Sequence, residues 1–190
     1  MIIFNHGHLR EHRAWRKGYW IYMVILRGRR VLLWRGRPED ADGLFQIRNE
    51  PEVARWWGAD DIKKEISEQF IGADDGFVIE AYGEVVGAIQ YHEEDDPMYR
   101  HAGMDIFLTT SRHGQGLGTE AIRLLASYHF EERGHHRLTI DPAADNTAAI
   151  RAYKRVGFRR VGIMRNYERG PDDVWHDGLL MDMLREEFRP

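Results

Sequence analysis

The sequence contains no cysteine and no apolar run long enough to cross a membrane. Without cysteine the chain can form no disulfide bond, no thiolate metal site and no cysteine nucleophile, which is compatible with a reducing cytoplasm. The apolar run from Tyr19 to Leu26 is eight residues long, whereas a membrane-spanning helix needs roughly 20. No small-residue cleavage site follows it, so it does not resemble a signal peptide. We therefore expect a cytoplasmic protein with no membrane partner.

Zinc-binding spacings are also absent, although the chain has ten histidines. None lies in a pattern such as H-E-x-x-H, so the sequence predicts no metal site. Acids are scarce at the start of the chain: residues 1–37 hold nine Lys or Arg and one acid, whereas residues 38–190 carry a net charge of −12. An acidic domain repels nucleic acid and attracts cationic substrates, unless its acidity serves only solubility. We expect no nucleic-acid partner.

The 190 residues suit one domain with a short extension. Residues 1–22 are basic and rich in histidine. We expect residues 1–18 not to pack, and residues 1–22 to be an N-terminal extension, either a dispensable or disordered tail or an overlong start, because Met23 begins a segment that reads like a natural protein start. Residues 23–190 are expected to form a single domain, as a monomer or a homodimer.

Strand and helix patterns alternate from Val31 onward. Two strands flank the hairpin signal Gly83-Glu84, and an amphipathic helix follows Gly116. The pattern predicts a mixed α/β (α+β) domain that is mainly antiparallel in its first half, with a strand-helix-strand unit in the middle. The expected strands are 31–35, 77–82, 85–91, 101–109, 137–141, 158–165 and 174–183, and the expected helices are 38–48, 51–70 (in one or two pieces), 116–132 and 146–156.

A glycine-rich segment, HGQGLGT at residues 113–119, lies between an expected strand and the long helix. Glycine lets the backbone turn sharply and lets an anion approach the free amides at the start of a helix. Those amides and the positive end of the helix dipole bind phosphate without a lysine. The segment lacks the lysine of a P-loop, and the strands before it do not form the βαβ unit of a Rossmann fingerprint. It indicates a phosphate-binding loop, or glycines that only make a tight turn.

A second segment, residues 141–158, places Asn146 at the start of an expected helix and Tyr153 seven residues later. Asn is a good N-cap. Seven residues are nearly two helical turns, so both side chains can face one groove, about 10 Å apart along the axis. A tyrosine there can donate its phenolic proton to a leaving group. Alternatively, Asn146 only caps the helix and Tyr153 packs in the core.

Together, the two segments resemble the GNAT superfamily of N-acetyltransferases over roughly residues 30–185. The glycine-rich segment resembles its Q/R-x-x-G-x-G/A motif, with His113 at the Gln/Arg position and Arg112 beside it. Asn146 to Phe158 resembles its N-x-x-A-i-x-x-Y-x-x-x-G-F helix. The resemblance implies the GNAT fold, a mixed and mainly antiparallel sheet of roughly six or seven strands with about four helices. Its two central strands, here 106–109 and 137–141, would splay apart.

The resemblance implies an enzyme that transfers the acetyl group of acetyl-CoA, a co-substrate used without a metal, to a primary amine. The amine attacks the thioester directly, and the lack of cysteine agrees with the absence of an acyl-enzyme. The pantetheine arm would insert at the splay, where Asn146 would bind it and Tyr153 would protonate the departing thiolate. The implied cofactor-binding residues are Ile106, Phe107, Leu108, His113, Gly114, Gln115, Gly116, Leu117, Gly118, Thr119, Asn146 and Tyr153.

Three further features resemble aminoglycoside 6'-N-acetyltransferases. Trp56 and Trp57 begin a WWG sequence. It resembles the WWG of those enzymes, which lies in a loop that forms one wall of their acceptor pocket. Asp105 lies on the strand next to the thioester, and Asp141 lies in a similar T-D-P strand end. These four are the expected substrate-binding residues, and the acids at 93–96 could add a carboxylate. Alternatively, the tryptophans are core aromatics and Asp141 only caps a turn.

Acidic walls attract and orient a polyamine such as an aminoglycoside. The attacking amine must lose a proton, and Asp105 could accept it only if burial raised its pKa above the usual value of roughly 3.9. Asp105 and Tyr153 are the expected catalytic residues, the first mainly through electrostatic positioning. Two alternatives remain open: a protein N-terminal or ribosomal-protein acetyltransferase, which segments 162–167 and 177–184 also resemble, and a non-catalytic sensor domain that binds acyl-CoA.

Overall fold

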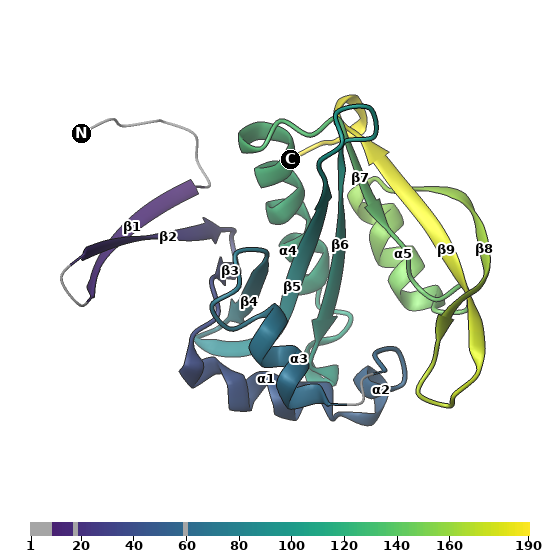
Figure 1. The fold of residues 1–190 in the computed structure, drawn as a ribbon, viewed down its shortest axis with the longest axis horizontal. Coiled ribbons are helices and arrows are strands. Elements are labelled where there is room, and N and C mark those ends of the chain that lie inside the picture. The colour runs from purple at the N-terminus through teal and green to yellow at the C-terminus, as the bar shows by residue number, and fades with distance from the viewer. Residues whose placement is uncertain (1–8, 17–18, 59–60) are drawn as a thin grey trace.

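The computed structural model describes residues 9–16, 19–58 and 61–190. Within these ranges nine strands form one sheet in the order β1-β2-β3-β4-β5-β6-β7-β9-β8, with helices packed against it (Figure 1). The strands are β1 (Leu9–Arg16), β2 (Tyr19–Arg27), β3 (Val31–Trp34), β4 (Gly76–Ala81), β5 (Glu84–Glu94), β6 (His101–Leu108), β7 (Arg137–Ile140), β8 (Arg159–Arg169) and β9 (Trp175–Leu184). The helices are α1 (Ala41–Arg48), α2 (Pro51–Ala54), α3 (Ile62–Gln69), α4 (Leu117–Ser127) and α5 (Thr147–Val156), with a π-helical turn, Tyr128–Glu132, after α4.

The sheet confirms the predicted mixed and mainly antiparallel class. All neighbouring strands pair antiparallel except β6 and β7, which are parallel. The tight β4–β5 turn follows from Tyr82 and Gly83, whose φ angles of 58° and 82° give the positive-φ pair that matches the twist of hairpin strands. No helix in the described part of the chain is long and apolar enough to span a membrane.

The first two strands were not expected. Residues 9–16 and 19–27 form an antiparallel hairpin that extends away from the rest of the sheet (Figure 1). The end of β2 joins the sheet by pairing Ile25 with Trp34 and Leu26 with Leu33. Residues 1–8 and 17–18 of the predicted extension lie outside the described residues. That residues 1–22 are dispensable stays a prediction.

Helices cover both faces of the sheet because strand side chains alternate between two cores. On β6, Met104 belongs to the larger core, which takes in the buried stripe of α4 and α5. Phe107, on the opposite face, belongs to a smaller core with residues of α1, α2 and α3. The amphipathic pattern of α4, with Leu117, Ala121 and Leu125 fully buried, therefore determines which face of α4 packs against the sheet.

The predicted splay lies between β6 and β7. These strands pair only at Ala102 with Leu138 and at Gly103 with Thr139. Beyond Gly103 the rest of β6 pairs with β5 alone, and the sheet opens toward the start of α4. This opening positions the candidate site.

Candidate active site

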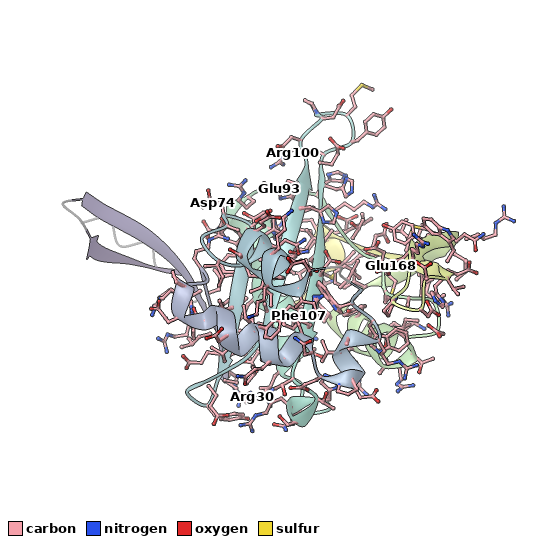
Figure 2. The ribbon with its side chains drawn as sticks, turned by 60° about the horizontal axis from the view of Figure 1, so that its bottom comes forward. Arg30, Asp74, Glu93, Arg100, Phe107 and Glu168 are labelled. Atoms are coloured by element: carbon pink, nitrogen blue, oxygen red, sulfur yellow. The ribbon has the colours of Figure 1, made fainter. Side chains whose placement is uncertain are left out.

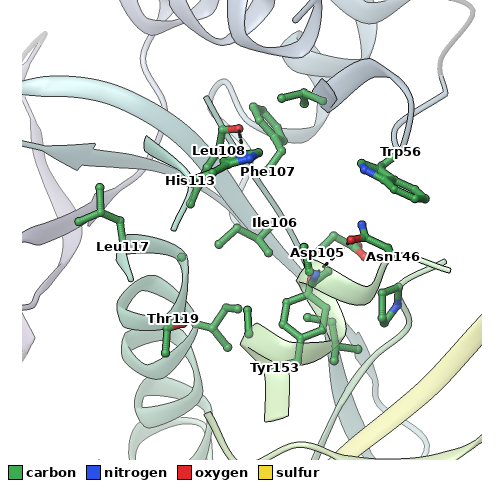
Figure 3. A pocket seen from close by; sticks show the side chains of 18 of the residues that line it. Trp56, Asp105, Ile106, Phe107, Leu108, His113, Leu117, Thr119, Asn146 and Tyr153 are labelled. Carbon is green, nitrogen blue, oxygen red and sulfur yellow. Dashed lines mark hydrogen bonds between the residues drawn. The ribbon is translucent and has the colours of Figure 1, made fainter. Parts of the chain in front are cut away.

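A cleft of about 1540 Å³ occupies the opening between β6 and β7. Its walls come from β6, the end of β7, the glycine-rich segment, α5 and the Trp56–Gly58 loop (Figure 3). Every predicted site residue lines this cleft except Gln115. The acids at 93–96, considered above as a further source of carboxylate, do not line it.

Gln115 does not line the cleft. Its side-chain Nε2 donates to the backbone carbonyl of Ser111 at 3.1 Å, and its backbone carbonyl accepts from Arg30 Nη1 at 2.8 Å. Arg30 also pairs with Glu120 at 3.0 Å. These bonds hold the loop against the start of β3, and the predicted cofactor-binding role of Gln115 stays a prediction.

The glycine-rich segment presents a row of free donors. Among the described residues, none of the backbone amides from Gly114 to Thr119 has a hydrogen-bond partner. Gly114 and Gly116 have φ angles of 72° and 79°, which turn the chain into α4 and which an L side chain would strain. Successive free amides at the positive end of a helix form an anion-binding concavity. The loop has the geometry of a pyrophosphate site.

His113 and Asn146 both contribute to local structure. The His113 ring bonds the carbonyl of Leu108 through Nε2 at 2.9 Å, so its side chain braces the loop against the end of β6. Asn146 Oδ1 accepts from the amide of Ala149 at 3.1 Å and caps α5. Because a side-chain amide also carries donors, the NH₂ group of Asn146 stays available at the cleft wall (Figure 3).

Tyr153 lies on α5 at the base of the opening (Figure 3). It is 8% exposed and packs against Phe158, with ring centroids 6.4 Å apart. Burial raises the pKa of Tyr153, and the nearby carboxylates of Asp105 and Asp141 raise it further. The phenol therefore keeps its proton at neutral pH and is a possible proton donor. Tyr153 packs in the core and also lines the cleft, and its role as a proton donor stays a prediction.

Three carboxylates share the opposite part of the cleft: Asp105 on β6, Asp141 after β7 and Glu168 on β8. Burial and then the charge of Asp141 raise the pKa of Asp105, against a hydrogen bond from Gln90 Nε2 at 3.3 Å. Desolvation and then the charges of Asp141 and Asp105 raise the pKa of Glu168. Like charges confined together raise one another's pKa, so the cleft carries a concentrated negative potential.

Glu168 and Tyr167 were missed by the sequence analysis. The Tyr167 hydroxyl donates to Asp141, which is the first cause of the raised pKa of Tyr167. The expected strand ended at Arg165, whereas β8 continues to Arg169 by pairing with β9. The run of polar residues after Arg165 has no apolar alternation, so no local signal could have placed these two side chains.

Trp56 and Trp57 form another wall of the cleft. Trp57 meets Phe107 edge to face with ring centroids 5.2 Å apart, and the Arg48 guanidinium lies 4.6 Å from the Trp57 centroid. Arg48 is fully buried and pairs with Glu65 at 2.9 Å. Trp56 lies under the guanidinium of Arg55 at 4.5 Å. Trp57 is thus a partly buried member of the smaller core and also a cleft wall.

The cleft is lined by charges of both signs. Asp105, Asp141 and Glu168 come from β6, the end of β7 and β8, and Glu120 and Asp145 add acids near α4 and α5. Arginines around the glycine-rich segment, α4 and α5 also line it, namely Arg29, Arg30, Arg112, Arg123, Arg151 and Arg155.

Comparisons with known proteins agree with this geometry. Residues 30–159 match the acetyltransferase (GNAT) domain family. Aminoglycoside N(6')-acetyltransferase type 1 from Klebsiella pneumoniae is 26% identical over 174 residues, 80% of this chain and 86% of that protein. Spermidine N(1)-acetyltransferase from Escherichia coli (strain K12) is 28% identical over 130 residues, 63% of this chain and 68% of that protein. The solved structure of AAC(6')-Ib in complex with paromomycin and acetyl-CoA gives a TM-score of 0.68 at 26% identity, covering 83% of this chain and 95% of that one.

The family match begins after β2 and spans the β4–β5 hairpin, the opening between β6 and β7, the glycine-rich segment and α5. The chain therefore belongs to the GNAT acetyltransferase family, and it is an acetyl-CoA-dependent N-acetyltransferase.

Proposed function

We propose that this enzyme acetylates a primary amino group of a small polycationic molecule of the aminoglycoside class, in the cytoplasm. The observation that carries the proposal is the group of three carboxylates, Asp105, Asp141 and Glu168, on the wall of the cleft that also holds the pyrophosphate loop. Their mutual repulsion is relieved when ammonium groups lie among them. A monocation would leave most of that negative charge uncompensated.

The names of the relatives support an acceptor of this kind. The Klebsiella relative is an aminoglycoside acetyltransferase and the Escherichia relative a spermidine acetyltransferase, and both acceptors carry several amines. Trp56 and Trp57 add a flat apolar wall beside the acids. An apolar face beside separated charges suits a rigid amino sugar better than a flexible peptide chain.

Acetyl-CoA, when bound, supplies the thioester whose acetyl group passes to the amine. Asp105 would orient the substrate ammonium and take up its proton directly or through a water molecule, a role favoured by the raised pKa of this carboxyl. As the carbon–nitrogen bond forms and the carbon–sulfur bond breaks, the Tyr153 hydroxyl would give its proton to the sulfur. The ammonium loses two protons on becoming the amide: one restores the tyrosine through solvent, the other passes from Asp105 to solvent, and the enzyme returns to its starting state.

The test is steady-state release of the CoA thiol with a panel of aminoglycosides, spermidine and N-terminal peptides. We expect turnover of the polycationic small molecules. Turnover of peptides alone would show a protein N-terminal acetyltransferase and contradict the proposal. Binding of CoA without turnover of any acceptor would show a sensor domain.

Asp105→Asn sharpens this test. The loss of one charge-assisted hydrogen bond, worth about 1.5–3 kcal/mol, predicts a decrease of about 10- to 100-fold in kcat/KM for the polycation. The KM for acetyl-CoA should stay unchanged. Asp95→Asn is the matched control, because Asp95 is exposed and does not line the cleft.

A further inference from the structure

A second group of ligating side chains lies at the other end of the sheet from the glycine-rich segment. It combines Glu93 near the end of β5, His129 in the π-helical turn after α4, and His135 just before β7. Figure 2 shows Glu93 far from Arg30, which marks the cofactor end. We propose that Glu93, His129 and His135 bind a Zn²⁺ ion that stabilises the closed end of the splayed sheet and takes no part in acetyl transfer.

Both histidines are completely enclosed. His129 is 0% exposed and His135 1%, whereas imidazole normally keeps contact with water or with a hydrogen-bond partner when it is buried. Nδ1 of His129 lies 3.4 Å from Nδ1 of His135. Oε1 of Glu93 lies 3.9 Å from His129 Nδ1 and 3.2 Å from His135 Nε2.

These separations fit a shared metal ion. Zinc binds histidine nitrogen and carboxylate oxygen at about 2.0–2.2 Å in a tetrahedron, which places any two ligand atoms about 3.3 Å apart. One atom from each of the three side chains can be chosen so that all lie within 4.8 Å of one another. A small rotation of the rings would close that triangle around the ion, with Nδ1 of His129, Oε1 of Glu93 and one nitrogen of His135 as ligands.

Hydrogen bonding between the two histidines leaves some of their ring nitrogens without a partner. Two neutral imidazoles can share one N–H···N bond, here between the Nδ1 atoms, and each then keeps a second ring nitrogen. Among the described residues, neither His129 Nε2 nor His135 Nε2 has a hydrogen-bond partner. The contact of His135 Nε2 with Glu93 is close enough for an ion pair but lacks hydrogen-bond geometry. A metal ion would take the place of the shared proton at Nδ1 of His129 and could also bind the unpartnered Nε2 of His135, which lies 3.2 Å from Glu93 Oε1.

A neighbouring guanidinium holds the Glu93 carboxylate in place. Arg133 bonds both oxygens of Glu93, at 3.2 Å from Nε and 2.6 Å from Nη2, which fixes the carboxylate as an outer partner fixes a metal ligand. Arg133 and Arg100 also oppose a cation, so we expect moderate affinity.

The experiment uses the full chain, first treated with a chelator and then titrated with ZnCl₂ in a thermal unfolding assay. At a hundredfold excess over the dissociation constant, we expect Tm to rise by about 5–10 °C. We also expect one zinc per chain after gel filtration, by elemental analysis. A wild-type protein that shows no Tm shift and retains no zinc would overturn the proposal.

Matched variants separate this site from other histidines. Glu93→Gln and His135→Gln should each abolish the zinc-induced Tm shift, whereas His136→Gln, at an exposed position next to His135, should keep it. An equal shift in the first two variants would assign the zinc to other histidines and refute the site. If neither variant folds, a wild-type protein that retains no zinc still refutes the site. Acetyl-transfer rates should be the same with and without zinc at a temperature where both forms are folded.

Discussion

Arg48 and Glu65 form a buried ion pair next to Trp57. Mutating one partner should lower the free energy of unfolding more than mutating the other. Arg48 is 0% exposed, and the side chain of Glu65 is 15% exposed. Glu65→Gln leaves a guanidinium that cannot lose its proton and cannot reach water, and such an uncompensated charge costs about 3–5 kcal/mol. Arg48→Met instead leaves a carboxylate with access to solvent and a pKa already raised by burial, so it can take up a proton.

For Arg48→Met we expect a smaller loss of about 1–2 kcal/mol, mainly from the cation–π contacts with Trp57 and Phe107. The free energy of unfolding by urea measures both changes, and Glu65→Gln should lower Tm by roughly 10 °C. Combining Arg48→Met with Glu65→Leu should recover most of the stability, because apolar residues replace the pair. If Glu65→Gln costs no more than Arg48→Met, the guanidinium does not depend on Glu65 and the reasoning fails.

Three further predictions concern the cleft. Tyr153→Phe should lower kcat by about 100-fold or more, the usual contribution of a general acid, with little change in the KM for acetyl-CoA; an unchanged kcat would remove Tyr153 from the mechanism. Asp141→Asn removes a charge that raises the pKa of Asp105, so the acidic limb of kcat/KM against pH should move to lower pH, and a fixed limb would mean that Asp105 is not the titrating group. Gly116→Ala forces a side chain to a φ of 79°, which costs about 1–2 kcal/mol and should raise the KM for acetyl-CoA; Gly162→Ala, where the added carbon meets no atom within 4 Å, is the control, and equal effects would refute the role of the loop.

Local sequence signals were sufficient to predict the β4–β5 hairpin, α4 and α5. The predicted hairpin signal Gly83-Glu84 lies one residue beyond the turn Tyr82-Gly83 that forms. That signal and the caps Gly116 and Asn146 act through a few neighbouring residues, so their patterns do not depend on the rest of the fold. Of the predicted site residues, Gln115 alone does not line the cleft, and its backbone carbonyl accepts from Arg30, far away in the sequence.

Features that depend on distant pairing could not be predicted. Glu168 enters the cleft because β8 continues along β9 past a register shift after Met164, at a place where the sequence pattern indicates a strand end. Arg48 lies in a short amphipathic helix, where an arginine normally indicates the solvent face, and only the third helix brings Glu65 to it. The β1–β2 hairpin was missed because its basic first strand lacks the apolar alternation that indicates burial.

The short pairing of β6 with β7, over only two residue pairs, also affects how the product CoA leaves. The sheet leaves backbone groups of β6 without a strand neighbour beyond Gly103, so in the predicted cofactor position an extended pantetheine arm would lie there as a temporary strand, and CoA carries the same arm as acetyl-CoA. The loop amides, as the predicted pyrophosphate site, would not distinguish the two, since the pyrophosphate is common to both. Spent CoA should thus compete with fresh acetyl-CoA for the opening, and its departure, rather than the transfer of the acetyl group, would set the turnover rate at saturating acceptor.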